Sequence, residues 1–110
     1  MDKKKNYQIS WSKKSLKSLD EIFTWNVENY SVQRAAKILN SIKSKANKIK
    51  ENPQLNHRYF GLSGDDSDIR AALVHETFWL FYKLDNHEIT ILDVIHSSMN
   101  PEDINLIGLN

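Results

Sequence analysis

The feature that most constrains this sequence is an apolar repeat in its first half. Between residues 32 and 49, apolar side chains recur at alternating spacings of three and four, which places them on one face of a helix. They are Val32, Ala35, Leu39, Ile42, Ala46 and Ile49. Lysine and arginine occupy the other face, and Pro53 ends the pattern because proline disfavours helical geometry in the residue before it. The repeat predicts an amphipathic helix that ends near Asn52, with Ser31 as its N-cap.

A second amphipathic helix is expected over residues 13–29, with Ser12 as its N-cap. Its apolar stripe consists of Leu16, Leu19, Phe23 and Tyr30. Two helices with almost no linker form a helical hairpin. Just upstream, apolar and polar residues alternate over residues 7–11, which is typical of a half-buried strand.

The second half of the chain changes to β-type patterning. Residues 69–74, 78–84 and 89–95 are rich in β-branched and aromatic side chains, and the breaks between them are short enough for hairpins. The whole order is strand, helix, helix and three strands. We therefore expect an α+β fold in which a helical hairpin packs on a small, mainly antiparallel sheet.

A chain of 110 residues has the usual length of one domain, and we assign residues 1–110 to a single domain. Within it, residues 1–5 are expected to be a flexible basic N-terminus and residues 101–110 a C-terminal tail with one short helical turn. The absence of cysteine excludes disulfides, thiolate zinc sites and a cysteine nucleophile. The longest apolar stretch has five residues, too few to cross a bilayer, and no signal peptide is evident. We expect a cytoplasmic protein without a membrane partner.

The formal net charge of +1 hides a strong asymmetry along the chain. Residues 1–50 hold twelve Lys and Arg against four Asp and Glu, a net charge of +8. Residues 51–110 hold three against ten, a net charge of −7. The half that contains the three-strand segment is thus acidic and poorly suited to meet a phosphate chain.

No established catalytic or cofactor-binding motif is present. The four histidines have no metal-ligand spacing on any one element, so we expect neither a metal nor a cofactor. Arg70 stands in an otherwise apolar strand, where its guanidinium suits phosphate or carboxylate. The alternative is an ion pair with Asp68 or Asp93. His96 ends the last strand and can act as a general acid or base, or be an exposed residue without a role.

Nearly the whole chain, from Tyr7 to about Ile104, resembles the RelE/ParE superfamily of bacterial type II toxins. The opening segment "YQISWSKKSLKSLDEIFTWNVENYS" is similar to the first strand and helix of the family, and "IKENPQL" to the end of its second helix. The stretch "IRAALVHETFWLFYKLDNHEITILDVIHSSMNP" resembles its strand arginine, aromatic strand, charged turn and aliphatic strand. Arg70 falls on that arginine.

The resemblance implies a growth-inhibiting toxin that a cognate antitoxin neutralises, possible toxin–antitoxin hetero-oligomers, and two classes of target. ParE-like members bind DNA gyrase, whereas RelE-like members cleave mRNA at the ribosome. In the RelE-like case Arg70 would bind the phosphate and His96 would donate a proton. Ser98 stands where many relatives have arginine, and no Lys or Arg follows Lys83. These departures favour the ParE-like function; a degenerate member that retains only antitoxin binding is a further alternative.

Four aromatic residues are candidates for contacts with the antitoxin or the target. They are Trp25, Tyr30, Trp79 and Tyr82. Core packing is the alternative for each of them. Whether the protein is an enzyme, an endoribonuclease, or only a binding protein is left open by the residues themselves.

Overall fold

The computed structural model describes residues 7–59 and 67–99. Its elements follow the predicted order and confirm the α+β class. They are β1 (Gln8–Trp11), α1 (Lys13–Asn29), α2 (Val32–Ile49), β2 (Asp68–Val74), β3 (Phe78–Leu84) and β4 (Glu88–His96). The expectations for residues 1–5 and 101–110 lie outside the described residues.

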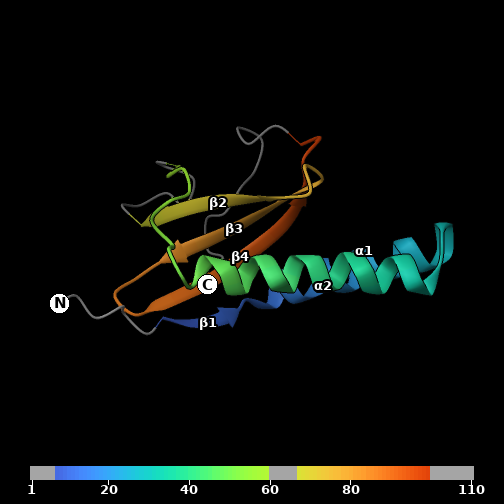
Figure 1. Cartoon of the computed structure of the whole chain (residues 1–110), viewed down its shortest axis with the longest axis horizontal. Coiled ribbons are helices and arrows are strands. Elements are labelled where there is room, and N and C mark those ends of the chain that lie inside the picture. The colour runs from blue at the N-terminus through green and yellow to red at the C-terminus, as the bar shows by residue number, and fades with distance from the viewer. Residues whose placement is uncertain (1–6, 60–66, 100–110) are drawn as a thin grey trace.

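The four strands form one mixed sheet in the order β1-β4-β3-β2. β1 pairs parallel with β4, and the other two pairs are antiparallel. Both helices lie on the same face of this sheet, and the end of the hairpin that joins α1 to α2 projects past the strands (Figure 1). The strands therefore do not reach the far end of the hairpin.

Serine caps fix where the two helices begin. The Ser12 hydroxyl accepts a hydrogen bond from the Ser15 amide at 3.0 Å, and the Ser31 hydroxyl accepts one from the Arg34 amide at 3.1 Å. Ser12 is also joined to β4, because its hydroxyl donates to the Leu92 carbonyl at 2.8 Å. The first cap therefore sets the position of α1 on the sheet as well as its start.

The core has a layer on each face of the sheet. The larger layer fills the space between helices and strands with side chains such as Leu19, Ile42, Leu80 and Ile91. The smaller layer lies on the opposite face and consists of Ile69, Ala71, Phe81, Leu92 and Ile95, with Tyr59 and Trp79 packed against it. Burial on both faces explains why β3 and β4 carry bulky residues without strict alternation.

A β-bulge in β4 decides which side chains face the helices. Phe81 pairs with Asp93, but the next residue of β3, Tyr82, pairs with Ile91, so Leu92 is the extra residue. Ile91 lies in the layer under the helices, and after the bulge that layer receives Val94. Strict alternation from Ile91 would have placed Ile95 there and turned His96 to the opposite face. The bulge therefore places His96 on the helix side.

The buried face of α1 differs from the predicted apolar stripe. Leu16 and Tyr30 are 53% and 58% exposed, whereas Ser15 and Asn26 are buried beside Leu19. Burial of the two polar side chains is tolerated because each bonds within its own helix. The Ser15 hydroxyl donates to the Ser12 carbonyl at 2.7 Å, and the Asn26 amide donates to the Ile22 carbonyl at 2.8 Å. Apolar groups on α1 are consequently left at the surface.

Candidate functional site

A groove of about 890 Å³ lies where the overhanging hairpin faces the end of the sheet. Both helices, the turn between β2 and β3, and the ends of β2, β3 and β4 contribute to its walls. Its apolar lining consists of Ile22, Ile38, Val74, Phe78 and Val94. We place the candidate functional site in this groove, because it combines an apolar floor with converging polar side chains.

Three side chains in contact with one another form the helical rim of the groove. The Trp25 and Tyr30 rings pack at a centroid distance of 5.7 Å, and the Arg34 guanidinium lies 4.2 Å from the Tyr30 ring centroid. Trp25 and Tyr30 are each more than half exposed. A cation over an aromatic face holds its charge in place while leaving its N–H groups free to bind an acceptor. Trp25 and Tyr30, both predicted as contact residues, thus lie at the groove.

His96 lies on the strand side of the same groove, with its ring edge-on to Phe78 at 5.7 Å. The Ser98 amide donates to Nδ1 of His96 at 3.0 Å. A nitrogen that accepts this bond carries no proton, so neutral His96 holds its proton on Nε2. In this state His96 offers an N–H donor at Nε2, and it cannot take up a proton there as a general base.

The turn between β2 and β3 brings a second histidine to the groove. The Thr77 amide donates to the Val74 carbonyl at 2.9 Å and closes the turn. Its two central residues, His75 and Glu76, have φ of 51° and 58°, in the left-handed region. The turn is fastened to the end of β4, because Ser97 donates from its amide to the Thr77 carbonyl at 2.7 Å and from its hydroxyl to the Glu76 carbonyl at 2.9 Å.

The ionisable side chains of the groove are mainly basic. Arg34 and Lys37 come from α2, His75 and His96 from the sheet end, and Glu21 is the acidic member. An adjoining hollow of about 470 Å³ shares Lys37 and His75 with the groove and adds Lys45 and Lys48. The basic charge that the sequence places in its first half thus reaches the sheet side of the molecule through α2.

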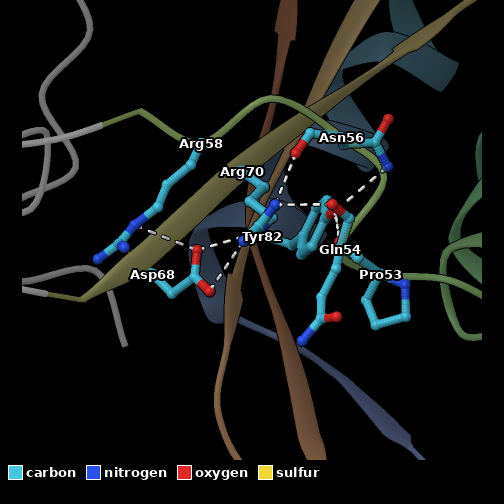
Figure 2. A network of polar contacts seen from close by, with 7 residues as sticks. All are labelled: Pro53, Gln54, Asn56, Arg58, Asp68, Arg70 and Tyr82. Carbon is cyan, nitrogen blue, oxygen red and sulfur yellow. Dashed lines mark hydrogen bonds and ion pairs between the residues drawn. The ribbon is translucent and has the colours of Figure 1, made fainter.

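Arg70 lies away from the groove, in a polar network at the other end of β2 (Figure 2). Its Nε and Nη2 donate to the two Asp68 carboxylate oxygens at 2.9 and 3.3 Å. Its Nη1 donates to the carbonyls of Gln54 and Asn56, both at 2.9 Å. Four of its five N–H donors are therefore engaged. The sequence left open whether Arg70 binds a ligand or forms an ion pair, and the structure contains the ion pair, with Asp68. Arg58 approaches the same carboxylate at 3.4 Å.

Tyr82 belongs to the same network and is fully buried. Its hydroxyl donates to the Pro53 carbonyl at 2.5 Å and accepts from the Asn56 side chain at 3.2 Å (Figure 2). Burial raises the pKa of the phenol above its ordinary value, while the Asn56 hydrogen bond and the Arg70 charge act in the opposite direction. Arg70 and Tyr82 together hold the segment that follows α2 against the sheet.

The six predicted site residues therefore fall into three places. Trp25, Tyr30 and His96 line the groove, Arg70 and Tyr82 share the network of Figure 2, and Trp79 packs on the opposite face of the sheet. Sequence reasoning missed His75 and Arg34. A histidine in a short turn and an arginine in a basic helix carry no sequence signal that distinguishes them from solvated residues.

Within residues 7–59 and 67–99, no helix has the length and apolarity needed to cross a membrane. The same residues contain no group of three or more His, Asp or Glu side chains arranged as metal ligands.

Comparison with known proteins agrees with this architecture. Residues 9–101 match the family model described as the ParE toxin of the type II toxin-antitoxin system, parDE. A chain from a solved structure, described as the chromosomal ParDE TA system from P. aeruginosa, shares the fold with a TM-score of 0.70. It is 19% identical, and the alignment covers 83% of this chain and 96% of that one. No curated protein matches the chain. Because the family model spans most of the sequence, this chain belongs to the ParE toxin family of type II toxin–antitoxin systems.

Proposed function

We propose that this chain inhibits growth by binding DNA gyrase, and that a cognate antitoxin neutralises it by binding the groove. Membership of the ParE family supports a toxin of this kind. The observation that carries the proposal is that the Arg70 guanidinium is already engaged within the fold. The one arginine that the resemblance places on a phosphate already bonds Asp68 and two backbone carbonyls.

RNA cleavage needs a base, an acid and a cation that stabilises the charge developing on the phosphate. Arg70 is committed to the fold, Ser98 replaces the usual arginine, and His96, whose Nδ1 accepts from Ser98, offers the N–H of a proton donor but no base. One observation favours the RelE-like alternative. Two histidines, Arg34 and Lys37 line a single groove, so the groove could attract a phosphate chain.

The groove also has features that suit a protein segment. Its lining is largely apolar, and exposed aromatic residues stand at its rim. Amphipathic segments bind by placing an apolar face into such a groove. We therefore assign Trp25 and Tyr30 to the antitoxin contact, in a hetero-oligomer that forms in the cytoplasm, where gyrase is found.

Gyrase assays with the purified chain test the proposal. The chain should inhibit supercoiling of a relaxed plasmid in a dose-dependent way, and the antitoxin should restore it. If gyrase supercoils DNA at its normal rate in the presence of a saturating concentration of the chain, the proposal is wrong. Growth that continues unimpaired during expression, together with intact antitoxin binding, would identify the chain as a degenerate member of the family.

His96 separates the two target classes better than Arg70 does, because loss of Arg70 also disturbs the fold. His96 is exposed, and within residues 7–59 and 67–99 its ring hydrogen-bonds Ser98 alone. Under the gyrase proposal, H96A arrests growth as the wild-type chain does and transcripts stay intact. Under RelE-like cleavage, the wild-type chain cuts transcripts, and H96A loses both cutting and arrest.

A further inference from the structure

We infer that the β2–β3 turn determines partner specificity, with His75 binding a carboxylate of an acidic amphipathic antitoxin segment that lies in the groove. The inference rests on the proposed antitoxin partner and adds the chemistry by which the groove selects it. Three observations carry it: the backbone conformation of the turn, its attachment to β4, and the charges around the groove.

The conformation of the turn is unfavourable for its residues. His75 and Glu76 both have positive φ, which places a side chain close to the backbone in any residue but glycine. Turns with positive φ at both central positions strongly favour Asn-Gly. His-Glu at these two positions makes a less stable turn than Asn-Gly would make in the same fold. Residues in such conformations gather at functional sites.

The hydrogen bonds that hold the turn would survive replacement of both side chains. Thr77 bonds the backbone carbonyls of Val74 and His75, and Ser97 bonds the carbonyl of Glu76. None of these bonds uses the imidazole of His75 or the carboxylate of Glu76. The identity of residue 75 is therefore not needed to close the turn or to fasten it to β4. What the histidine adds is an exposed imidazole at the wall of the groove.

The surroundings of His75 indicate the chemistry of the occupant. Arg34, Lys37 and His96 line the same groove, Lys45 and Lys48 line the adjoining hollow, and Glu21 is the opposing charge. Carboxylates complement this set. The apolar residues beneath them need an apolar face on the same partner, which a bare phosphate chain does not provide. An acidic amphipathic protein segment fits both features, whereas RNA fits the charge and can stack its bases on the rim aromatics but has no aliphatic face for the residues beneath.

Two single substitutions separate the strain of the turn from the role of the imidazole. E76G relieves positive φ at one position and keeps His75. H75N places a residue that tolerates the left-handed region at the other position and removes the imidazole. Both variants should melt at a higher temperature than the wild-type chain, by up to a few degrees. The probe is the antitoxin encoded beside this chain's gene, titrated by calorimetry.

E76G should bind this antitoxin at least as tightly as the wild-type chain does. H75N should bind about tenfold more weakly, because the asparagine side chain is too short to place its amide N–H where the imidazole donates to the carboxylate. Replacing the contacted Asp or Glu of the antitoxin by its amide should weaken the wild-type complex and leave the H75N complex unchanged.

The outcomes distinguish this inference from the proposed function. If the wild-type chain binds the antitoxin and H75N binds it equally well, the role of His75 is overturned while the antitoxin assignment stands. If the wild-type chain does not bind the antitoxin, the proposed function fails and the inference fails with it. Tighter binding of a single-stranded RNA oligonucleotide than of the antitoxin, with the loss again seen in H75N, would overturn the protein-segment assignment.

Discussion

At the residue scale, Arg70 contributes to the stability of the fold. Its guanidinium joins Asp68 to two carbonyls of the segment that follows α2, so truncation removes the donor that the half-buried Asp68 carboxylate and Asn56 carbonyl share with the exposed Gln54 carbonyl. We expect R70A to lower the free energy of unfolding by about 2–3 kcal/mol. Urea denaturation measures this loss.

Arg70→Lys is the matched control, since it keeps the charge but not the planar fork that spans both Asp68 oxygens. Its stability should lie between those of the wild-type chain and R70A. An R70A variant as stable as the wild-type chain would show that the network of Figure 2 does not hold the fold.

Tyr82 gives the fold a specific pH dependence. Because burial raises the pKa of its phenol above 10, the unfolded chain loses this proton at a lower pH than the folded chain. The contribution of Tyr82 to stability is therefore constant below about pH 10 and decreases as the pH rises above it. Urea denaturation of the wild-type chain and Y82F over this range isolates the effect. Y82F should lose less stability per pH unit, and parallel curves would contradict the assignment.

Residue-scale prediction from the sequence succeeded where the partner is close in sequence. The Arg70–Asp68 pair spans two positions and was one of the stated alternatives. The place of His75 in the groove was not predictable, because it depends on a turn conformation and on the attachment of that turn to Ser97, more than twenty residues away.

At the scale of elements, the two N-caps make different contributions. Ser12 caps α1 from a buried position and also donates to β4, whereas the Ser31 hydroxyl caps α2 at the surface. S12A should therefore lower the free energy of unfolding by about 2 kcal/mol and S31A by about 1 kcal/mol. Thermal or urea denaturation of the two variants measures the difference, and equal losses would show that the Ser12–Leu92 bond contributes nothing.

The elements themselves were predictable because each has its own period of apolar residues. The helices and the strands of the second half lie within about three residues of their expected positions, the largest difference being the end of α2 at Ile49 instead of near Asn52. The bulge at Leu92 and the exposure of Leu16 were not predictable. Both are set by long-range packing, which overrides the local pattern: one extra residue in β4 shifts its alternation, and buried Ser15 and Asn26 displace the apolar stripe of α1.

At the scale of the whole molecule, the structure shows where the charges of the two halves of the chain meet. The sequence indicated a basic first half and an acidic second half, and the sheet half was expected to be the less suitable one for phosphate. In the structure, α2 carries basic side chains to the groove, where they meet the two histidines of the sheet end. The fold thus assembles one basic, apolar-lined groove from both halves of the chain.

The central claim is that this chain stops growth by binding gyrase and not by cutting RNA. The most direct test is the supercoiling of a reporter plasmid, read together with the length of its transcripts, in bacteria in which the chain is induced without antitoxin. The account predicts that the plasmid loses negative supercoils while its transcripts keep their full length. A plasmid with unchanged supercoiling and shortened transcripts would contradict it.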